Sequence, residues 1–212
     1  MTFLEFHQYV KKDSLMYSWI TDKFYLSRKK IEASEKITVN KEEVIIMEKG
    51  LLVQESDGKK PVIHRVFADH RIIFTIQDSF QLTALETSTY SIIPTEKLFS
   101  QLDASGLLSN FFLQIAEDLE RDLERDKKLR SVSPEERANI VLALIINHYK
   151  IDPVENPDFP KWLRVNVLAK LAKCPVSTAS QIMRELMEKG VSEIPPKYGS
   201  KVEPSISHPS CA

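Results

Sequence analysis

The sequence predicts an α+β fold, with an N-terminal antiparallel β-roll, a long dimerisation helix and a C-terminal helix-turn-helix. Three observations lead to this prediction. Short β-branched and aromatic segments recur about every ten residues between residues 24 and 99, a highly charged helical segment follows, and two short helical segments lie on either side of a tight turn. We therefore divide the 212 residues into a sensor or effector β-roll over 1–102, a dimerisation helix over 103–131 and a third domain over 132–212.

Composition excludes several classes of protein. The chain is 42% hydrophobic, with 29 basic and 30 acidic residues, as expected of a folded protein and not of a disordered polybasic one. The longest apolar run, Ile140 to Ile146, is far shorter than the roughly 20 residues of a membrane helix. Because the first residues also lack a secretory pattern, we expect a cytoplasmic protein with no membrane partner. Cys174 and Cys211 are too few for an iron–sulfur or zinc cluster, and we expect no cofactor and no metal.

Within the first hundred residues the hydrophobic pattern changes from one typical of helices to one typical of strands. Apolar spacing predicts one or two short helices in the first 20 residues, and Asp57-Gly58 predicts a hairpin turn. Segments with the composition of strands suggest an antiparallel barrel or roll. They occupy residues 36–39, 43–47, 51–53, 62–66, 72–76, 80–84 and 90–93.

Helical patterns return at residues 94–102 and continue from about Ala104 to Arg130. Eleven of the fourteen residues from Glu117 to Arg130 are charged, several of them spaced for pairing one turn apart, so we expect this helix to stand largely in solvent. A narrow apolar stripe on such a helix is what a two-helix dimer seam needs, and the alternative is packing against the chain's own β-domain. The stripe consists of Leu108, Phe112, Ile115, Leu119 and Leu123.

The third domain opens with a strong helix start. Ser133 is placed to cap the helix, Pro134 to occupy its first turn, and Glu136 to complete a capping box. Apolar spacing continues this helix to Tyr149. A proline-rich link over 151–160 and a short strand over 162–165 should follow.

Residues 166–173 and 176–189 form two helical stretches with a tight turn between them. The turn requires Lys173 to adopt a positive φ, a position where glycine is common. Residues 161–212 hold eight basic and four acidic residues, a net charge of +4 on an otherwise acidic chain, which suits a polyanionic partner. Five apolar residues should form the shared core, with Ala169 allowing a close crossing of the helices. They are Leu168, Leu171, Ala179, Ile182 and Leu186.

The outward residues of the second helix suit the major groove of DNA, although any helical hairpin with a polar exterior would show the same pattern. Hydroxyl and amide groups can bond base edges or phosphates, an apolar side chain can contact a thymine methyl, and basic side chains can reach phosphates. The candidate DNA-binding residues are Arg164, Lys170, Lys173, Val176, Ser177, Thr178, Gln181, Arg184 and Lys197.

Taken together, these segments resemble the catabolite-activator/FNR (Crp/Fnr) family of bacterial transcription regulators. The match is carried by VNVLAKLAKCPVSTASQIMREL at 165–186, by SPEERANIVLAL at 133–144 and by residues 25–67. The resemblance implies a cyclic-nucleotide-binding-like jelly roll, a C-terminal winged helix-turn-helix and a homodimer whose two recognition helices read a palindromic operator in double-stranded DNA. It implies a regulator of transcription and not an enzyme, with RNA polymerase a candidate further partner.

Two departures limit what can be carried over. Cyclic-nucleotide members of the family hold the phosphate with glycines and an arginine, whereas residues 67–93 contain no glycine and a single arginine, Arg71. We therefore expect no cAMP dependence, and an effector that is unidentified or absent. Residues 195–196 and 205–212 are poor strand material for a wing, although residues 197–201 could form a basic turn at the phosphates. The alternative function is a cupin-like small-molecule sensor whose helical C-terminal module binds protein and not DNA.

Two further features have a functional and an ordinary interpretation. His64 and His70 are the best metal or haem candidates in the roll, but their spacing does not place them at one site, and polar surface histidines are commoner. Cys174 could be redox-sensitive because the neighbouring Lys173 would lower its pKa, or it could be a small buried residue of the turn.

Overall fold

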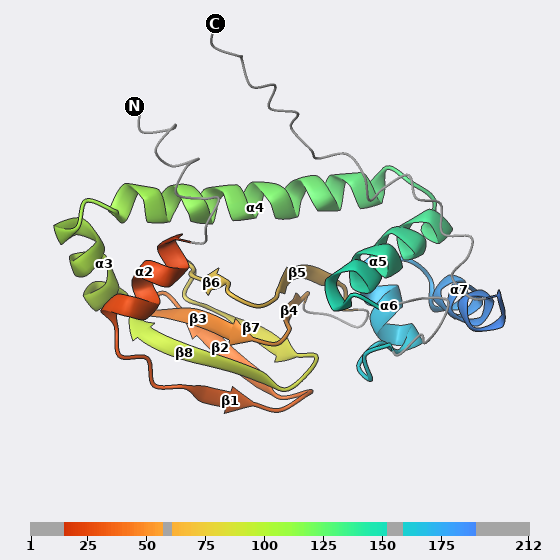
Figure 1. Ribbon diagram of the computed structural model, residues 1–212. Helices are drawn as coiled ribbons and strands as arrows, with labels where there is room; N and C mark the ends of the chain where they lie inside the picture. Colours follow the sequence, from red (N-terminus) through yellow and green to blue (C-terminus); the bar gives the residue numbers. More distant parts are fainter. Residues whose placement is uncertain (1–14, 57–60, 152–158, 190–212) are drawn as a thin grey trace, which may run out of the picture. The chain divides into compact units, whose positions relative to one another are not determined.

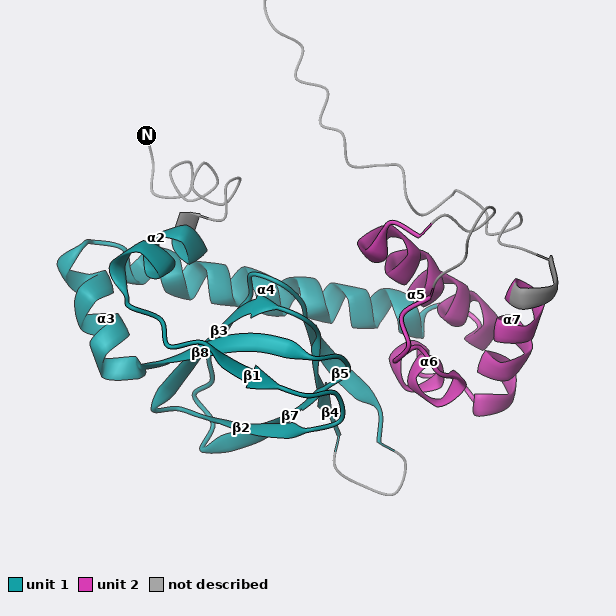
Figure 2. Ribbon diagram, turned by 60° about the horizontal axis from the view of Figure 1, so that its bottom comes forward, with its two compact units in different colours: residues 1–131 teal, residues 132–212 magenta. Residues whose placement is uncertain are grey.

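The computed structural model describes residues 15–56, 61–151 and 159–189, and the chain divides into two compact units, 1–131 and 132–212 (Figure 2). The first unit carries α2 (Leu15–Lys23), a set of β-strands, α3 (Thr95–Ala104) and α4 (Leu108–Arg130). The second carries α5 (Pro134–Tyr149), α6 (Val165–Ala172) and α7 (Val176–Lys189) (Figure 1). The predicted order of β-roll, long helix and C-terminal helices is confirmed, while the wing lies outside the described residues.

The strands of the first unit form two antiparallel four-stranded sheets. Their orders are β1-β8-β3-β6 and β2-β7-β4-β5, so consecutive strands often lie in different sheets, as a roll requires. All seven predicted strand segments appear, and the hairpin predicted around Asp57 lies outside the described residues. The strands are β1 (Lys29–Ile31), β2 (Lys36–Asn40), β3 (Glu43–Lys49), β4 (Leu52–Glu55), β5 (Ile63–Phe67), β6 (Ile72–Ile73), β7 (Ser79–Ala84) and β8 (Ser88–Pro94).

The central strand β3 is buried on both faces. Ile45 and Met47 belong to the cluster that the two sheets enclose, together with Phe67 and Leu82. The alternate residues of β3 point to the other side of the first sheet, because successive side chains on a strand face opposite ways. A strand covered on both sides reads as a continuous apolar run, which explains the Val-Ile-Ile-Met sequence of β3.

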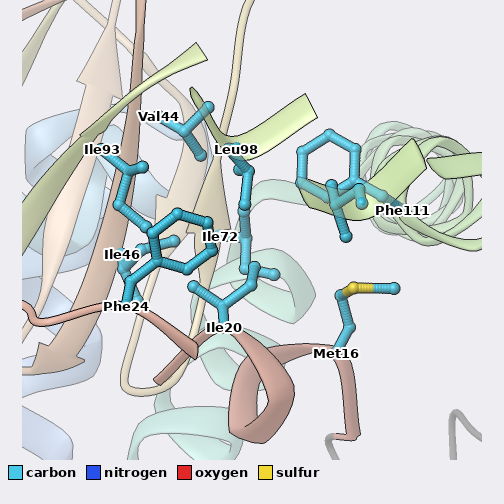
Figure 3. Packing of buried hydrophobic residues seen from close by; sticks show 10 residues of the cluster. Met16, Ile20, Phe24, Val44, Ile46, Ile72, Ile93, Leu98 and Phe111 are labelled. Carbon is cyan, nitrogen blue, oxygen red and sulfur yellow. The ribbon is translucent and has the colours of Figure 1, made fainter. Parts of the chain in front are cut away.

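Helices α2, α3 and α4 cover the outer face of the first sheet. Figure 3 shows Ile20 of α2 and Phe111 of α4 gathered with Ile46 and Ile93 of the sheet. Phe111 is fully buried, and its ring lies 5.5 Å from that of Phe99 in α3. These helices therefore complete a second core, and α4 is anchored to the roll at its N-terminal half.

One expectation is wrong, and two features of the first unit were not predicted. Residues 162–165 are not a strand: consecutive backbone bonds from Leu163 to Pro160 and from Arg164 to Trp162 form tight turns, and α6 begins at Val165. Strand β1 was not predicted, because Lys-Lys-Ile carries no strand signal and becomes a strand only by pairing with β8. Helix α4 is mostly exposed from Glu117 onward, as expected, but its two buried aspartates form ion pairs with Arg65 and Arg71 of the roll, which the sequence did not predict. None of the helices in the described ranges is both long and apolar enough to cross a membrane.

Candidate nucleic-acid interface

Helices α6 and α7 pack as a helix-turn-helix against α5. The shared core is made of small and aliphatic side chains, and Ala169 is buried at the point where the sequence predicted a close crossing. Leu171 and Leu186 are half-buried, not fully buried, and Ala172 and Met183 complete the core. The fully buried or nearly buried members are Leu168, Ala169, Ala172, Ala179, Ile182 and Met183.

The turn between α6 and α7 has the predicted strained backbone. Lys173 ends α6 in the left-handed region, with φ 51° and ψ 43°, which confirms the positive φ expected from the sequence. The amide of Cys174 donates to the carbonyl oxygen of Ala169 at 3.1 Å, and this bond satisfies a carbonyl at the end of α6. Pro175 follows at the entrance of α7, where its missing N–H costs nothing.

Helix α5 supports the turn from outside the motif. Its start is as predicted, since the Ser133 hydroxyl accepts a hydrogen bond from the Glu136 amide at 3.2 Å and Pro134 lies in the first turn. One residue later, Arg137 Nη1 donates to the carbonyl oxygen of Lys173 at 2.8 Å. Arg137 was not among the predicted residues, because nothing in a helical pattern reveals a contact across 36 residues.

The start of α7 presents a solvent-exposed face of mixed chemistry. Val176 is 52% exposed, and Ser177 is exposed beside it. Gln181 is exposed one turn further on, and its amide nitrogen donates to Glu185 Oε1 at 2.9 Å. Arg184 is exposed, whereas Thr178 is half-buried. Helix α7 thus offers hydroxyl, amide, guanidinium and apolar groups along one exposed side, which are the groups that read base edges.

The predicted basic residues are distributed over α6 and the approach to it. Arg164 is exposed immediately before α6, and Lys170 and Lys173 are half-buried and make further interactions of their own. Lys197 lies outside the described residues. The structure therefore places three of the four predicted phosphate contacts on the helix-turn-helix and its entrance.

Cys174 lies in the turn and is half-buried. Burial raises the pKa of its thiol above the ordinary value, and the nearby Arg137 guanidinium opposes that rise without cancelling it. Of the two interpretations of Cys174, the raised pKa favours the partly buried residue of the turn over the redox-sensitive thiol beside Lys173. A thiol with a raised pKa has less of the nucleophilic thiolate, so the residue serves as part of the turn.

The predicted dimerisation stripe on α4 is partly covered and partly exposed. Leu108 and Ile115 pack against the core cluster of the roll, so the alternative interpretation holds for these two residues. Phe112 and Leu119 are each 41% exposed and Leu123 is 70% exposed. Three apolar side chains on one highly charged helix thus remain available to a partner.

Arginines of the roll that could have held an anionic ligand are paired within the chain. Arg71 Nη1 lies 3.0 Å from Asp118 Oδ1, and Arg65 Nε lies 2.9 Å from Asp122 Oδ2. Arg121 also pairs with Asp118 on α4 itself. Nothing in the sequence pattern pointed to Asp118 or Asp122, which stood among many charged residues.

The histidine candidates do not form a metal site. His64 and His70 are both exposed, and His70 contacts the ring of Tyr17 edge to face at 4.9 Å. Within the described ranges no group of three or more His, Cys, Asp or Glu side chains is arranged to hold a metal ion. The ordinary interpretation of polar surface histidines therefore accounts for both residues.

Comparison with known proteins identifies the fold. No protein-family model matches the chain, and no curated protein matches its sequence. Among solved structures, FixK2 from Bradyrhizobium japonicum matches with a TM-score of 0.64 and 10% identity over 77% of this chain and 85% of that one. CLP, described as the c-di-GMP responsive global regulator of Xanthomonas campestris, has a TM-score of 0.62 and 12% identity over 83% and 91%. TTHB099, a CRP-family transcriptional regulator from Thermus thermophilus, has a TM-score of 0.63 and 10% identity over 75% and 84%.

These matches extend over both units and share one architecture. The resemblance to Crp/Fnr regulators noted in the sequence is therefore confirmed at the level of the fold. At sequence identities of 10 to 12%, these matches establish the fold of this chain. They do not establish that it shares the ligands or DNA sites of the matched proteins.

Proposed function

We propose that this chain, which has the Crp/Fnr regulator fold, is a dimeric, sequence-specific DNA-binding transcription regulator that works without cAMP. The observation that carries the proposal is the exposed start of α7, where Ser177, Gln181 and Arg184 lie on a helix whose other side is buried against α6. A helix presented in this way fits the major groove, with its first turns against the base edges. The chain is then a binding protein and not an enzyme.

Sequence readout is assigned to the exposed side chains of α7. Ser177 and Thr178 bond base edges or phosphates, and Val176 meets a thymine methyl. Gln181 reads a base edge with its amide. Its nitrogen donates one hydrogen to Glu185, so the second N–H and the carbonyl oxygen are left to pair with a base such as adenine. Arg184 lies one turn further along and reaches a base or a phosphate.

Phosphate contacts are assigned to the basic side chains around the motif: Arg164, Lys170, Lys173 and Lys197. They supply affinity and set the register of the helix on the duplex, but carry no sequence information. The +4 charge of residues 161–212 supports this assignment.

Dimerisation is assigned to α4, through Phe112, Leu119 and Leu123 with Leu108 and Ile115 at the edge of the roll. Two copies related by a two-fold axis place two recognition helices about one DNA turn, roughly 34 Å, apart, so the operator is palindromic. An effector or partner that changed the packing of the two α4 helices would change this spacing and shift the population of the DNA-competent form.

Residues 67–93 of the roll, all of which the structure describes, support independence from a cyclic phosphate. Their single arginine, Arg71, is paired with Asp118, and the same stretch has no glycine to let the backbone approach an anion. Any effector is therefore of another chemistry, or the dimer is competent without one.

The test is selection of random duplex DNA by the purified, effector-free protein, followed by titration of the selected sequence at two salt concentrations. We expect a palindrome with half-sites about one helical turn apart and a steep fall in affinity with salt. The Gln181→Ala, Arg184→Ala double variant should lose the preference for that sequence by at least about tenfold. The control, Asn147→Ala with His148→Ala on the exposed side of α5, should keep it.

Two results would contradict the proposal. One is a flat salt dependence, because phosphate contacts release counterions. The other is recovery of no sequence together with unchanged behaviour of the α7 double variant in every assay, which would favour a sensor whose C-terminal module binds protein.

A further inference from the structure

Helix α4 carries two buried carboxylates on the side that faces the roll. Asp118 and Asp122 have side chains only 5% and 10% exposed, and each is held between an arginine of the roll and an arginine of α4. Arg71 and Arg121 pair with Asp118, while Arg65 and Arg125 pair with Asp122. Burying a carboxylate costs free energy unless it is paired, whereas leucines at these two positions would carry no such cost. The two aspartates therefore require a physical explanation.

The roll arginines come from the edges of both sheets. Arg65 lies on β5, the edge strand of the second sheet, and its Cζ atom lies over the ring of Phe67, 4.6 Å from the ring centre. Arg71 immediately precedes β6, the edge strand of the first sheet, and its carbonyl oxygen accepts from the Met47 amide at 2.8 Å. Both guanidiniums are thus presented by fixed backbone, and the two helix ion pairs tie α4 to both sheets.

The positions along α4 show what these ion pairs control. Because a helix turns about 100° per residue, Phe111, Asp118 and Asp122 lie within about 20° of one line along its surface. The apolar stripe that ends in Leu119 and Leu123 is centred about 80° from that line. The face with the two aspartates and the face with the apolar stripe are therefore adjacent on α4, and a rotation of the helix would exchange which of them contacts the roll.

Rotation of α4 by one residue would place Leu119 and Leu123 against the roll and expose the aspartates. That rotation would leave Arg71 and Arg65 without counter-ions at a partly covered site, and unpaired buried charges are strongly unfavourable. A face made only of leucines would carry no such penalty, because apolar contacts are nondirectional.

We propose that Asp118 and Asp122 are positioning residues that fix the rotation of α4 on the roll, and so determine that Leu119 and Leu123 form the surface offered to a second copy of the chain. This inference rests on the proposed dimer and adds the residues that select its seam. The ion pairs act as specificity elements: they favour one rotation over its neighbour without having to raise overall stability.

The test measures rotation directly by disulfide cross-linking in a full-length background that carries Cys174→Ser and Cys211→Ser. Leu123→Cys reports the proposed seam, and Glu120→Cys, on the far side of α4, reports other rotations. The dimer should cross-link at least about tenfold faster through position 123 than through position 120.

The decisive variant replaces both ion pairs by apolar side chains: Arg65→Met, Arg71→Met, Asp118→Leu and Asp122→Leu. Its melting temperature should equal or exceed that of the parent, because apolar replacements of buried ion pairs are often neutral or stabilising. Its preference for cross-linking at position 123 should fall, because the burial of Phe111 must then fix the rotation without the ion pairs. A Glu124→Leu, Lys128→Leu control adds two leucines on the exposed side, leaves position 120 free for its cysteine reporter, and should keep the preference.

A milder variant, Asp118→Asn with Asp122→Asn, keeps the shape of both side chains and removes their charge. It should lower both the melting temperature and the preference for position 123. Retention of the parental preference in either variant would overturn the inference while leaving the proposed regulator intact. Failure of the parent to dimerise, or to cross-link at position 123, would instead reject the proposed seam itself.

Discussion

Arg137 Nη1 donates a hydrogen bond to the carbonyl oxygen of Lys173, 2.8 Å away, and so connects the first turn of α5 to the strained turn of the helix-turn-helix. That carbonyl ends α6, where backbone acceptors have no partner within the helix and where a cation is favoured by the helix dipole. The turn that sets the direction of α7 is therefore held by a side chain 36 residues earlier in the chain.

Replacing Arg137 by Met should destabilise the second unit by about 1–3 kcal/mol, because the carbonyl of Lys173 loses a charged donor. The measurement is urea unfolding followed by Trp162 fluorescence in a Trp19→Phe background. Trp162 reports on this unit through its packing and its hydrogen bond to the Tyr149 hydroxyl at 3.1 Å. Lys161→Met, on an exposed side chain, should change the unfolding free energy by less than about 0.5 kcal/mol, and an equal loss in both variants would remove the assigned role of Arg137.

Lys173→Gly should stabilise the second unit by about 0.5–1 kcal/mol, because relief of the left-handed strain exceeds the added entropy of the unfolded chain. The same change should weaken DNA binding and reduce its salt slope by about one, because a phosphate contact is lost. Lys150 offers a matched control, since it ends α5 with nearly the same backbone, φ 51° and ψ 41°. Lys150→Gly should bring the same stabilisation with no effect on DNA affinity, and a parallel loss of affinity in both would argue against a Lys173 phosphate contact.

The thiol of Cys174 predicts a pH dependence of stability. Because burial raises its pKa in the folded state, the folded chain holds the proton more tightly than the unfolded chain does. This contribution to stability is present below about pH 9, the ordinary pKa of the thiol, and is lost as the pH rises through the folded-state pKa. Urea titrations between pH 7 and about pH 10 should show the advantage of the parent over Cys174→Ala shrinking with pH. A constant difference would show that the thiol keeps its ordinary pKa.

Two adjacent phenylalanines should respond in different ways. Phe111→Ala removes a fully buried ring and should cost about 3–5 kcal/mol in the unfolding free energy of the first unit, followed by Trp19 in a Trp162→Phe background. Phe112 is 41% exposed and makes edge contacts with the rings of Phe74, Phe99 and Phe111, so Phe112→Ala should cost about 1 kcal/mol while weakening dimerisation. Equal losses of monomer stability, with no change in dimerisation, would show that Phe112 belongs to the core and not to the seam.

Local sequence patterns accounted for most of the elements. Alternating and continuous β-branched runs predicted the strands, because the period of a strand is visible within five residues, as β3 shows. The capping signals of Ser133 and Pro134 placed the start of α5 for the same reason, since the bonds that define a helix start lie within one turn. The positive φ of Lys173 followed from its position in a helix-turn-helix, where glycine is common.

Long-range pairing was not visible in the same way. Strand β1 exists because Lys29 to Ile31 lie opposite β8, and nothing in the three residues themselves favours that pairing. The interpretation of α4 as a helix largely in solvent holds for most residues from Glu117 to Arg130, but charge density did not say which charges are matched within the chain. Asp118 and Asp122 look like their neighbours in the sequence and differ only in facing Arg71 and Arg65.

The sequence by itself determined the α+β class, the position of the helix-turn-helix and its exposed face. Periodicity and capping signals involve residues that are close together in the sequence, so they can be identified without the fold. Tertiary structure alone decided which side of α4 meets the roll, which arginine supports the turn at Lys173, and that Cys174 is half-buried with a raised pKa. The physical reason is that ion pairing, hydrogen bonding between elements and burial depend on distances between residues 36 to 57 positions apart, and only the fold sets those distances.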